Sequence, residues 1–180
     1  MIEARVFVKE LDSARAVLDV EKADFKGFYK IHDTIFQNDI TKTPLSEEFL
    51  RLRYIPENIW DEKAVILAIK KTIVRTTGKV SNIPAKIQID NLEDAQRYYE
   101  NNFRDTYSED YSFWRDGWQY YLPNGDVVDL EIVEDDYPTI EFKSETDDGI
   151  LALIAKFGIS KHQIIDGPSV TAIRKLLKSS

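Results

Sequence analysis

The chain has 180 residues, 43% hydrophobic and 31% charged, a balance typical of one globular domain with a substantial core. Its formal net charge of −8 argues against nonspecific nucleic-acid binding, which needs a basic surface, but it does not exclude a basic cavity. The absence of cysteine excludes disulfides, thiolate metal sites and cysteine nucleophiles. No apolar run reaches 18 residues and the N-terminus has no signal-like stretch, so we expect a cytoplasmic protein without a membrane segment.

Strand patterns dominate the first half of the chain, where apolar or β-branched residues alternate with polar ones. Residues 11–20 instead carry apolar side chains at helical spacing. The expected strands cover residues 2–9, 28–36, 48–55, 63–72 and 85–90, and residues 74–84 are expected to form a turn or mobile loop.

The second half opens with a helix over residues 91–103, because an Asn cap and an acidic first turn precede apolar residues at helical spacing. Strands follow over 111–122, 127–134 and 139–144, and Asn124-Gly125 is a strong hairpin signal between the first two. Helices over 146–157 and 168–178 close the chain.

These elements predict an α+β fold with an eight-stranded, mainly antiparallel sheet and four flanking helices. Eight strands suffice to close a tunnel or barrel around a ligand-sized interior. The two halves repeat a weak strand–helix–strands order, and no linker interrupts them. We therefore expect a single domain over residues 1–180.

Each expected strand has one apolar face and one charged face. In the first strand Ala4, Val6 and Val8 alternate with a charged set that also contains Phe7. The charged faces carry Glu3 and Arg5, Arg51 and Arg53, Lys70, Lys86 and Gln88, Asp129 and Glu131, and Glu141 and Lys143. They could face bulk water, as antiparallel sheets often do, or line a closed interior that binds a polyanion through arginine forks. Periodicity alone does not separate the two.

The order of these segments resembles the CYTH superfamily, the triphosphate tunnel metalloenzymes that include class IV adenylyl cyclases and thiamine triphosphatases. "EARVF" stands where that family has ExExK, "HDTIF" resembles its D-x-Y-F strand and "LRLR" its paired-arginine strand. "ILAIKK" resembles its T-x-K strand, "VVDLEIVE…TIEFK" its late acidic strands, and "FGISKHQII…SVTAIRKLL" its C-terminal helical tail. The resemblance covers nearly the whole chain and implies an antiparallel eight-stranded tunnel.

The resemblance also implies the chemistry of the tunnel, in which basic residues grip a triphosphate and glutamates hold a bridging Mg2+ or Mn2+. Positioning and charge neutralisation are most of what phosphoryl transfer needs. On this basis Glu3 and Glu141 are the expected catalytic residues, and a metal is expected on Glu3, Asp129, Glu131 and Glu141. The expected phosphate-binding residues are Arg5, Arg51, Arg53, Lys70, Lys86, Arg115 and Lys143.

The sequence departs from the family pattern where a metal would be held. Arg5 and Phe7 replace the second glutamate and the lysine of ExExK, and Lys143 replaces the second acid of the final strand. Two such exchanges raise the local charge by about four units with all groups ionised as usual. Arg5 and Lys143 would repel Mg2+, and they could neutralise an anion in its place.

Three functions follow as alternatives. The first is metal-assisted hydrolysis of a triphosphate or cyclisation of ATP, and the second is metal-independent binding of a phosphate-bearing small molecule. The third is an interaction module whose charged faces are exposed. His32 as a general base and Trp114 in an aromatic cluster that stacks a ring are further possibilities, though such residues are more often structural. We expect a monomer or homodimer with a small-molecule ligand, no nucleic acid and no membrane partner.

Overall fold

A computed structural model describes residues 1–57, 65–165 and 169–179, and within them eight β-strands and four α-helices confirm the predicted α+β fold. The strands are β1 (Ile2–Phe7), β2 (Asp24–Asn38), β3 (Glu48–Glu57), β4 (Val65–Val74), β5 (Lys79–Ile89), β6 (Tyr107–Tyr121), β7 (Val127–Val133) and β8 (Tyr137–Ser144). The α-helices are α1 (Asp12–Val20), α2 (Leu92–Asn102), α3 (Asp147–Lys156) and α4 (Ser169–Ser179), and a 3-10 turn covers Lys161–Gln163.

The strands close into a barrel in the order β1-β5-β4-β3-β2-β6-β7-β8, with every neighbouring pair antiparallel. Within the described residues, β1 pairs with β8 over six residues, whereas it pairs with β5 only at Glu3 and Lys79. Gly125, with φ of 89°, occupies the left-handed region in the predicted hairpin turn between β6 and β7. The strand pairing that closes the barrel is therefore shortest between β1 and β5.

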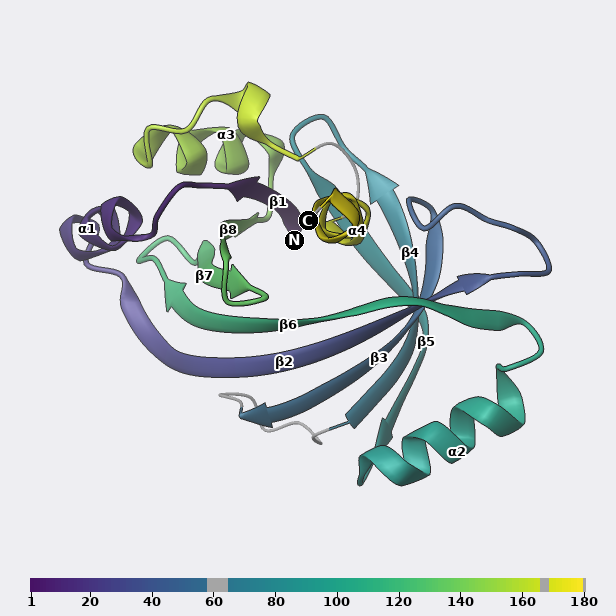
Figure 1. Cartoon of the computed structure of the whole chain (residues 1–180). Coiled ribbons are helices and arrows are strands. Elements are labelled where there is room, and N and C mark those ends of the chain that lie inside the picture. Colours follow the sequence, from purple (N-terminus) through teal and green to yellow (C-terminus); the bar gives the residue numbers. More distant parts are fainter. Residues whose placement is uncertain (58–64, 166–168, 180) are drawn as a thin grey trace.

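Helices cover the outer faces of the barrel, as alternation predicts (Figure 1). α1 and α3 pack on the outer side of β1, β7 and β8, where Ala4 and Val6 join a core with Leu18 and Ile150. α2 packs through Ala95 on the outer side of β4 and β5. Within the described residues, no helix is long and apolar enough to cross a membrane.

α4 packs on the inner side of the sheet rather than on its outside (Figure 1). Val170 and Ile173 pack against Ile35, Phe49 and Phe113 at one end of the interior. The helix is also held by its backbone, because the Tyr111 hydroxyl donates to the Val170 carbonyl. α4 therefore lines the interior as well as ending the chain.

The prediction of a loop over residues 74–84 is wrong in its second part. The turn lies at residues 75–78, closed by a hydrogen bond of 2.8 Å from the Arg75 amide to the Gly78 carbonyl, and β5 already begins at Lys79. Gly78 fits there because a Cβ atom would lie 2.4 Å from the Glu3 carbonyl oxygen. The ends of two predicted elements, residues 63–64 and 168, lie outside the described residues.

Candidate anion site inside the tunnel

A cavity of about 150 Å³ lies inside the barrel and is lined by the charged strand faces. Glu3 and Arg5 point into it from β1, while Phe7 packs against the apolar cluster beside α4. Arg5 is only 3% exposed and Glu131 only 1%. The charged faces of these strands therefore line a closed interior, and they are not the solvated surface that an interaction module would need.

The cavity is more basic than the protein around it. Seven cationic side chains and five carboxylates line it, which leaves a formal excess of two positive charges in a chain of net charge −8. The cations are Arg5, Arg51, Arg53, Lys70, Lys79, Arg115 and Lys143, and the carboxylates are Glu3, Asp33, Asp129, Glu131 and Glu141.

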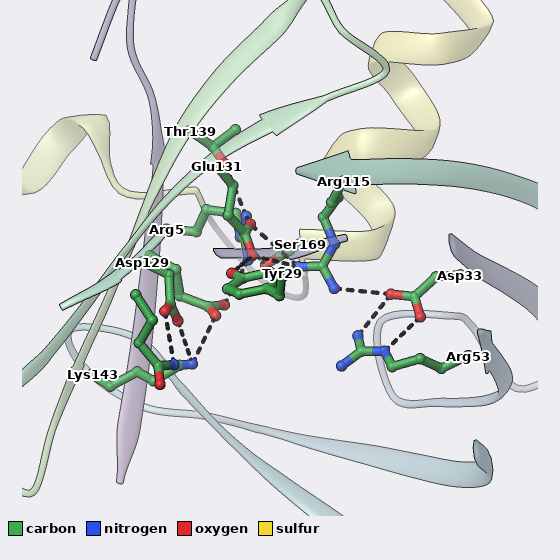
Figure 2. Close-up of polar contacts among 12 residues, drawn as sticks. Arg5, Tyr29, Asp33, Arg53, Arg115, Asp129, Glu131, Thr139, Lys143 and Ser169 are labelled. Atoms are coloured by element: carbon green, nitrogen blue, oxygen red, sulfur yellow. Dashed lines mark hydrogen bonds and ion pairs between the residues drawn. The ribbon is translucent and has the colours of Figure 1, made fainter. Parts of the chain in front are cut away.

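Arg5 forms ion pairs with two acids on one wall of the cavity (Figure 2). Its guanidinium pairs with Glu131 and, at 2.9 Å, with Glu141, and it also donates to Thr139 at 2.9 Å. Glu131 accepts further hydrogen bonds from Arg115 at 2.9 and 3.2 Å. Burial alone would raise the pKa of Glu131, but the charges of Arg115 and Arg5 lower it to about 2. Glu131 is therefore held ionised by two arginines.

Tyr29 completes the surroundings of Glu131 from β2. Its hydroxyl donates to Glu131 Oε1 at 2.5 Å, and burial together with the charge of Glu131 raises the pKa of the phenol. The ring fits against β6 only because position 117 is glycine, where a Cβ atom would lie 2.1 Å from Tyr29 Cζ. Gly117 thus makes room for this hydrogen bond.

Asp33 is the acid that organises the arginines of β3 (Figure 2). Its carboxylate accepts a bidentate pair of hydrogen bonds from Arg53, both of 2.7 Å, and a further hydrogen bond from Arg115 at 3.0 Å. Although burial opposes ionisation, the charges of Arg53 and Arg51 hold the pKa of Asp33 well below its usual range. A single carboxylate thus faces three arginines.

Lys143 engages the remaining acids. Its ammonium lies 2.6 Å from Asp129 Oδ2 and 3.4 Å from Glu141 Oε2, and Gln119 donates to the other oxygen of Asp129 at 2.9 Å. Burial nevertheless raises the pKa of Asp129. The two cations that replace acids of the family pattern, Arg5 and Lys143, are therefore bound to the acids that remain.

Three cations form a second wall that lacks close carboxylates in the described part of the chain. Arg51 comes no closer than 3.8 Å to Asp33, and its buried Nε has no hydrogen-bond partner among the described residues. To the described residues, Lys70 makes no hydrogen bond or ion pair, and Lys79 makes one side-chain hydrogen bond, to the Ser169 hydroxyl at 2.5 Å. Burial and the charge of Arg51 lower the pKa of Lys70 to about 7. An anion bound here would remove the repulsion between these groups.

The carboxylates do not fit a resident divalent cation. Asp129, Glu131 and Glu141 all accept contacts from Arg5, Arg115 or Lys143, so a cation would have to displace those partners. Over the described residues, no three acidic or histidine side chains are grouped as metal ligands. Ligand oxygens held by arginine and lysine are poor partners for Mg2+ because the cations repel it.

The structure brings all but one of the nominated site residues to the cavity. The exception is Lys86, which is exposed and lies farther along β5, where Lys79 and Ser81 reach the cavity instead. His32 and Trp114 also lie outside the cavity lining, with their rings 4.7 Å apart and Lys30 5.4 Å from the indole. They form part of the outer face of β2 and β6.

Several cavity residues carry little signal in the sequence. Tyr29, Ile31 and Asp33 share the inward face of β2. The signal in the sequence is therefore a lone acid on an otherwise apolar strand face. Lys79 was hidden because its segment resembled a loop. Ser169 had no local signal, since 164 positions separate it from Arg5, to which it is hydrogen-bonded.

Comparison of the sequence with family models finds no match, and comparison with curated proteins finds none either. Solved structures, however, share the fold over almost the whole chain. A conserved hypothetical protein from Pyrococcus furiosus superposes with a TM-score of 0.71 at 16% identity, over 94% of this chain and 98% of that one.

Two further structures carry functional descriptions. A candidate adenylyl cyclase from Hippeastrum, described as having a dominant triphosphatase activity, gives a TM-score of 0.64 at 15% identity, over 97% of this chain and 95% of its own. A candidate adenylate cyclase from Vibrio parahaemolyticus gives 0.65 at 14% identity, over 99% and 97%. The chain therefore shares its fold with these structures, and that fold is the closed eight-stranded antiparallel barrel that the resemblance implies.

Proposed function

We propose that this tunnel binds a small phosphate-bearing anion without a resident divalent cation. The observation that carries the proposal is the wall of Arg51, Lys70 and Lys79, three cations of the interior that have no carboxylate within 3.5 Å among the described residues. Buried charges are normally paired at close range, and a site whose cations lack close carboxylates is suited to a ligand of opposite charge.

Phosphate oxygens match these groups in chemistry. Arg51 offers a planar fork of donors and Lys70 a point charge, and both strengthen their hydrogen bonds when the acceptor is ionised. Two proteins with the same fold are described as candidate adenylyl cyclases, one of them with a dominant triphosphatase activity, and these descriptions support phosphate chemistry as the ligand class. Arg5 and Lys143 neutralise the acids across the cavity, a task that a metal performs in the family pattern.

Metal-assisted hydrolysis of a triphosphate, or cyclisation of ATP, is the second candidate function. One observation favours it: Glu3 lines the cavity and has no ion pair or hydrogen bond to any other described side chain. A cation that arrives with the ligand could use this carboxylate. Mg2+ dependence separates the two candidates.

The test is calorimetric titration of the protein with tripolyphosphate, ATP and thiamine triphosphate, each with Mg2+ and with EDTA. We expect binding that persists in EDTA and that is weakened in Arg51→Ala. The matched control is Lys9→Met, which removes a cation from an exposed position on the same chain. Binding that requires Mg2+ would favour the second candidate, and unchanged binding by Arg51→Ala would refute the assignment of this wall.

A further inference from the structure

Ser169 lies at the start of α4 with its hydroxyl between two cations of the cavity. Its Oγ is 2.5 Å from Lys79 Nζ and 3.1 Å from Arg5 Nε, which donates to it (Figure 2 shows Ser169 beside Arg5). Ser169 is 8% exposed and lines the same cavity as the proposed anion wall. A hydroxyl in this position loses its proton more readily, because Arg5 stabilises an oxyanion and the amine of Lys79 lies within reach of the proton.

Lys79 is an unusual partner for a serine. It is 9% exposed, and no carboxylate of the described chain lies within ion-pair distance of its ammonium. The Ser169 hydroxyl is its one hydrogen-bond partner in that part of the chain. Burial lowers the pKa of Lys79, with Glu141 opposing and Arg5 adding to the effect. A lysine in such surroundings can accept a proton, as in serine–lysine catalytic pairs.

The serine is also held in place. Val170 and Ile173 fix the next turn of α4 in the apolar cluster at the end of the cavity. Farther along the helix, Arg174 Nη2 donates to Asp110 Oδ1 at 2.7 Å. A reacting group on a helix that is packed and hydrogen-bonded in this way is positioned for an aligned attack.

We propose that Ser169 is a nucleophile for phosphoryl transfer and that Lys79 is its general base. This inference rests on the proposed function, because the phosphoryl donor is the anion bound by Arg51 and Lys70. Lys79, as the neutral amine, takes the hydroxyl proton while Oγ forms a bond to the terminal phosphorus of a bound polyphosphate. The bond between that phosphorus and the bridging oxygen breaks, and its electron pair leaves with the shortened polyphosphate.

Arg5 Nε stabilises the charge that develops on Oγ, and Arg51 and Lys70 hold the charge of the leaving group. Lys79 then returns its proton to the leaving polyphosphate. In the second step Lys79 removes a proton from water as the water oxygen bonds to phosphorus. The bond from phosphorus to Oγ breaks, and Oγ regains a proton from Lys79. The balance is one polyphosphate and one water consumed, with one phosphate and one shorter polyphosphate formed.

The test uses the full chain with tripolyphosphate as the probe, in EDTA. Phosphate release is followed over time, and acid-quenched samples are digested and mapped by mass spectrometry. We expect one added phosphoryl group on the peptide that contains Ser169. Ser169→Ala should lose both the label and phosphate release while tripolyphosphate still raises its melting temperature, and Lys79→Met should slow release by about 10²- to 10⁴-fold.

Ser81→Ala is the matched control, because Ser81 lines the same cavity but has no lysine hydrogen-bonded to it in the described structure. It should keep the label on Ser169. The inference is overturned where Ser169→Ala releases phosphate at the wild-type rate, or where the wild type binds tripolyphosphate but gains no phosphoryl group and releases no phosphate. That second result leaves the proposed function standing, whereas no binding of tripolyphosphate removes both.

Discussion

Replacing Lys70 with methionine should stabilise the empty protein and remove most of its response to anions. Methionine has a similar length and no charge, so the change removes a cation that has no partner in the described structure. The gap between the ordinary lysine pKa of 10.5 and the value of about 7 corresponds to about 5 kcal/mol. Lys70 is half-buried and water screens part of this, so we expect a gain of about 2 kcal/mol in the free energy of unfolding.

The sign of the pH dependence follows from the same pKa. Between about pH 7 and 10.5 the unfolded chain keeps a proton on this lysine that the folded chain has released. The wild type therefore gains stability as the pH rises through this range, and Lys70→Met lacks that gain. The difference between the two proteins should be largest below pH 7 and small above pH 10.5.

Urea denaturation at several pH values, with and without tripolyphosphate, measures both effects, and Lys9→Met controls for the loss of one positive charge. A ligand at one hundred times its Kd stabilises a protein by about 2.7 kcal/mol. Lys70→Met should lose most of this stabilisation relative to the wild type. The reasoning is wrong if Lys70→Met is less stable than the wild type at pH 6, or if its response to tripolyphosphate is undiminished.

Four other outcomes are expected. Arg51→Ala should weaken tripolyphosphate binding by about 10- to 100-fold in calorimetry, because a charged hydrogen bond is lost. Arg5→Glu should lower stability by about 3–5 kcal/mol by placing like charges together, and Mg2+ should raise its melting temperature more than that of the wild type. Glu131 is held at a pKa of about 2 against an ordinary 4.5, so the stability it supplies is complete above pH 4.5 and is lost toward pH 2. Acid denaturation of Glu131→Gln should lack that part of the slope. Gly117→Ala should cost about 1–3 kcal/mol in urea denaturation because its methyl group would overlap the ring of Tyr29.

Strand alternation was sufficient to predict the closed sheet and the inward faces of several strands. Glu3 and Arg5 follow a strict period of two, as do Arg51 and Arg53, and over the described residues no register shift interrupts the pairing of β1 with β8 or of β3 with β4. The resemblance to an ordered set of motifs then supplied what periodicity lacks, because it distinguishes the inside of a tunnel from a solvated surface.

A register shift in β5 helps to explain why Lys79 and Ser81 reach the cavity. Ala68 pairs with Lys86, but the pairing slips by one residue between Ile69 and Lys71, so that Thr72 lies opposite Ser81. Such a bulge changes which residues of β5 lie next to Lys70, and it depends on tertiary packing rather than on local sequence. The contacts of Ser169 were hidden for a related reason, since they are set by where α4 docks and not by the residues around it.

The altered motif is better explained as a coherent exchange than as decay of a metal site. A buried charge without a partner costs several kcal/mol, so random loss of metal ligands would favour apolar residues at positions 5 and 143. Instead both positions hold cations whose partners are the surviving acids Glu131, Glu141 and Asp129. These pairs occupy one wall. On the other wall Arg51 reaches Asp33 only at 3.8 Å, and Lys70 has no ion pair with any described carboxylate. Under the proposed function, this exchange keeps the wall that would bind an anion and places side chains of the protein where the family pattern has a metal.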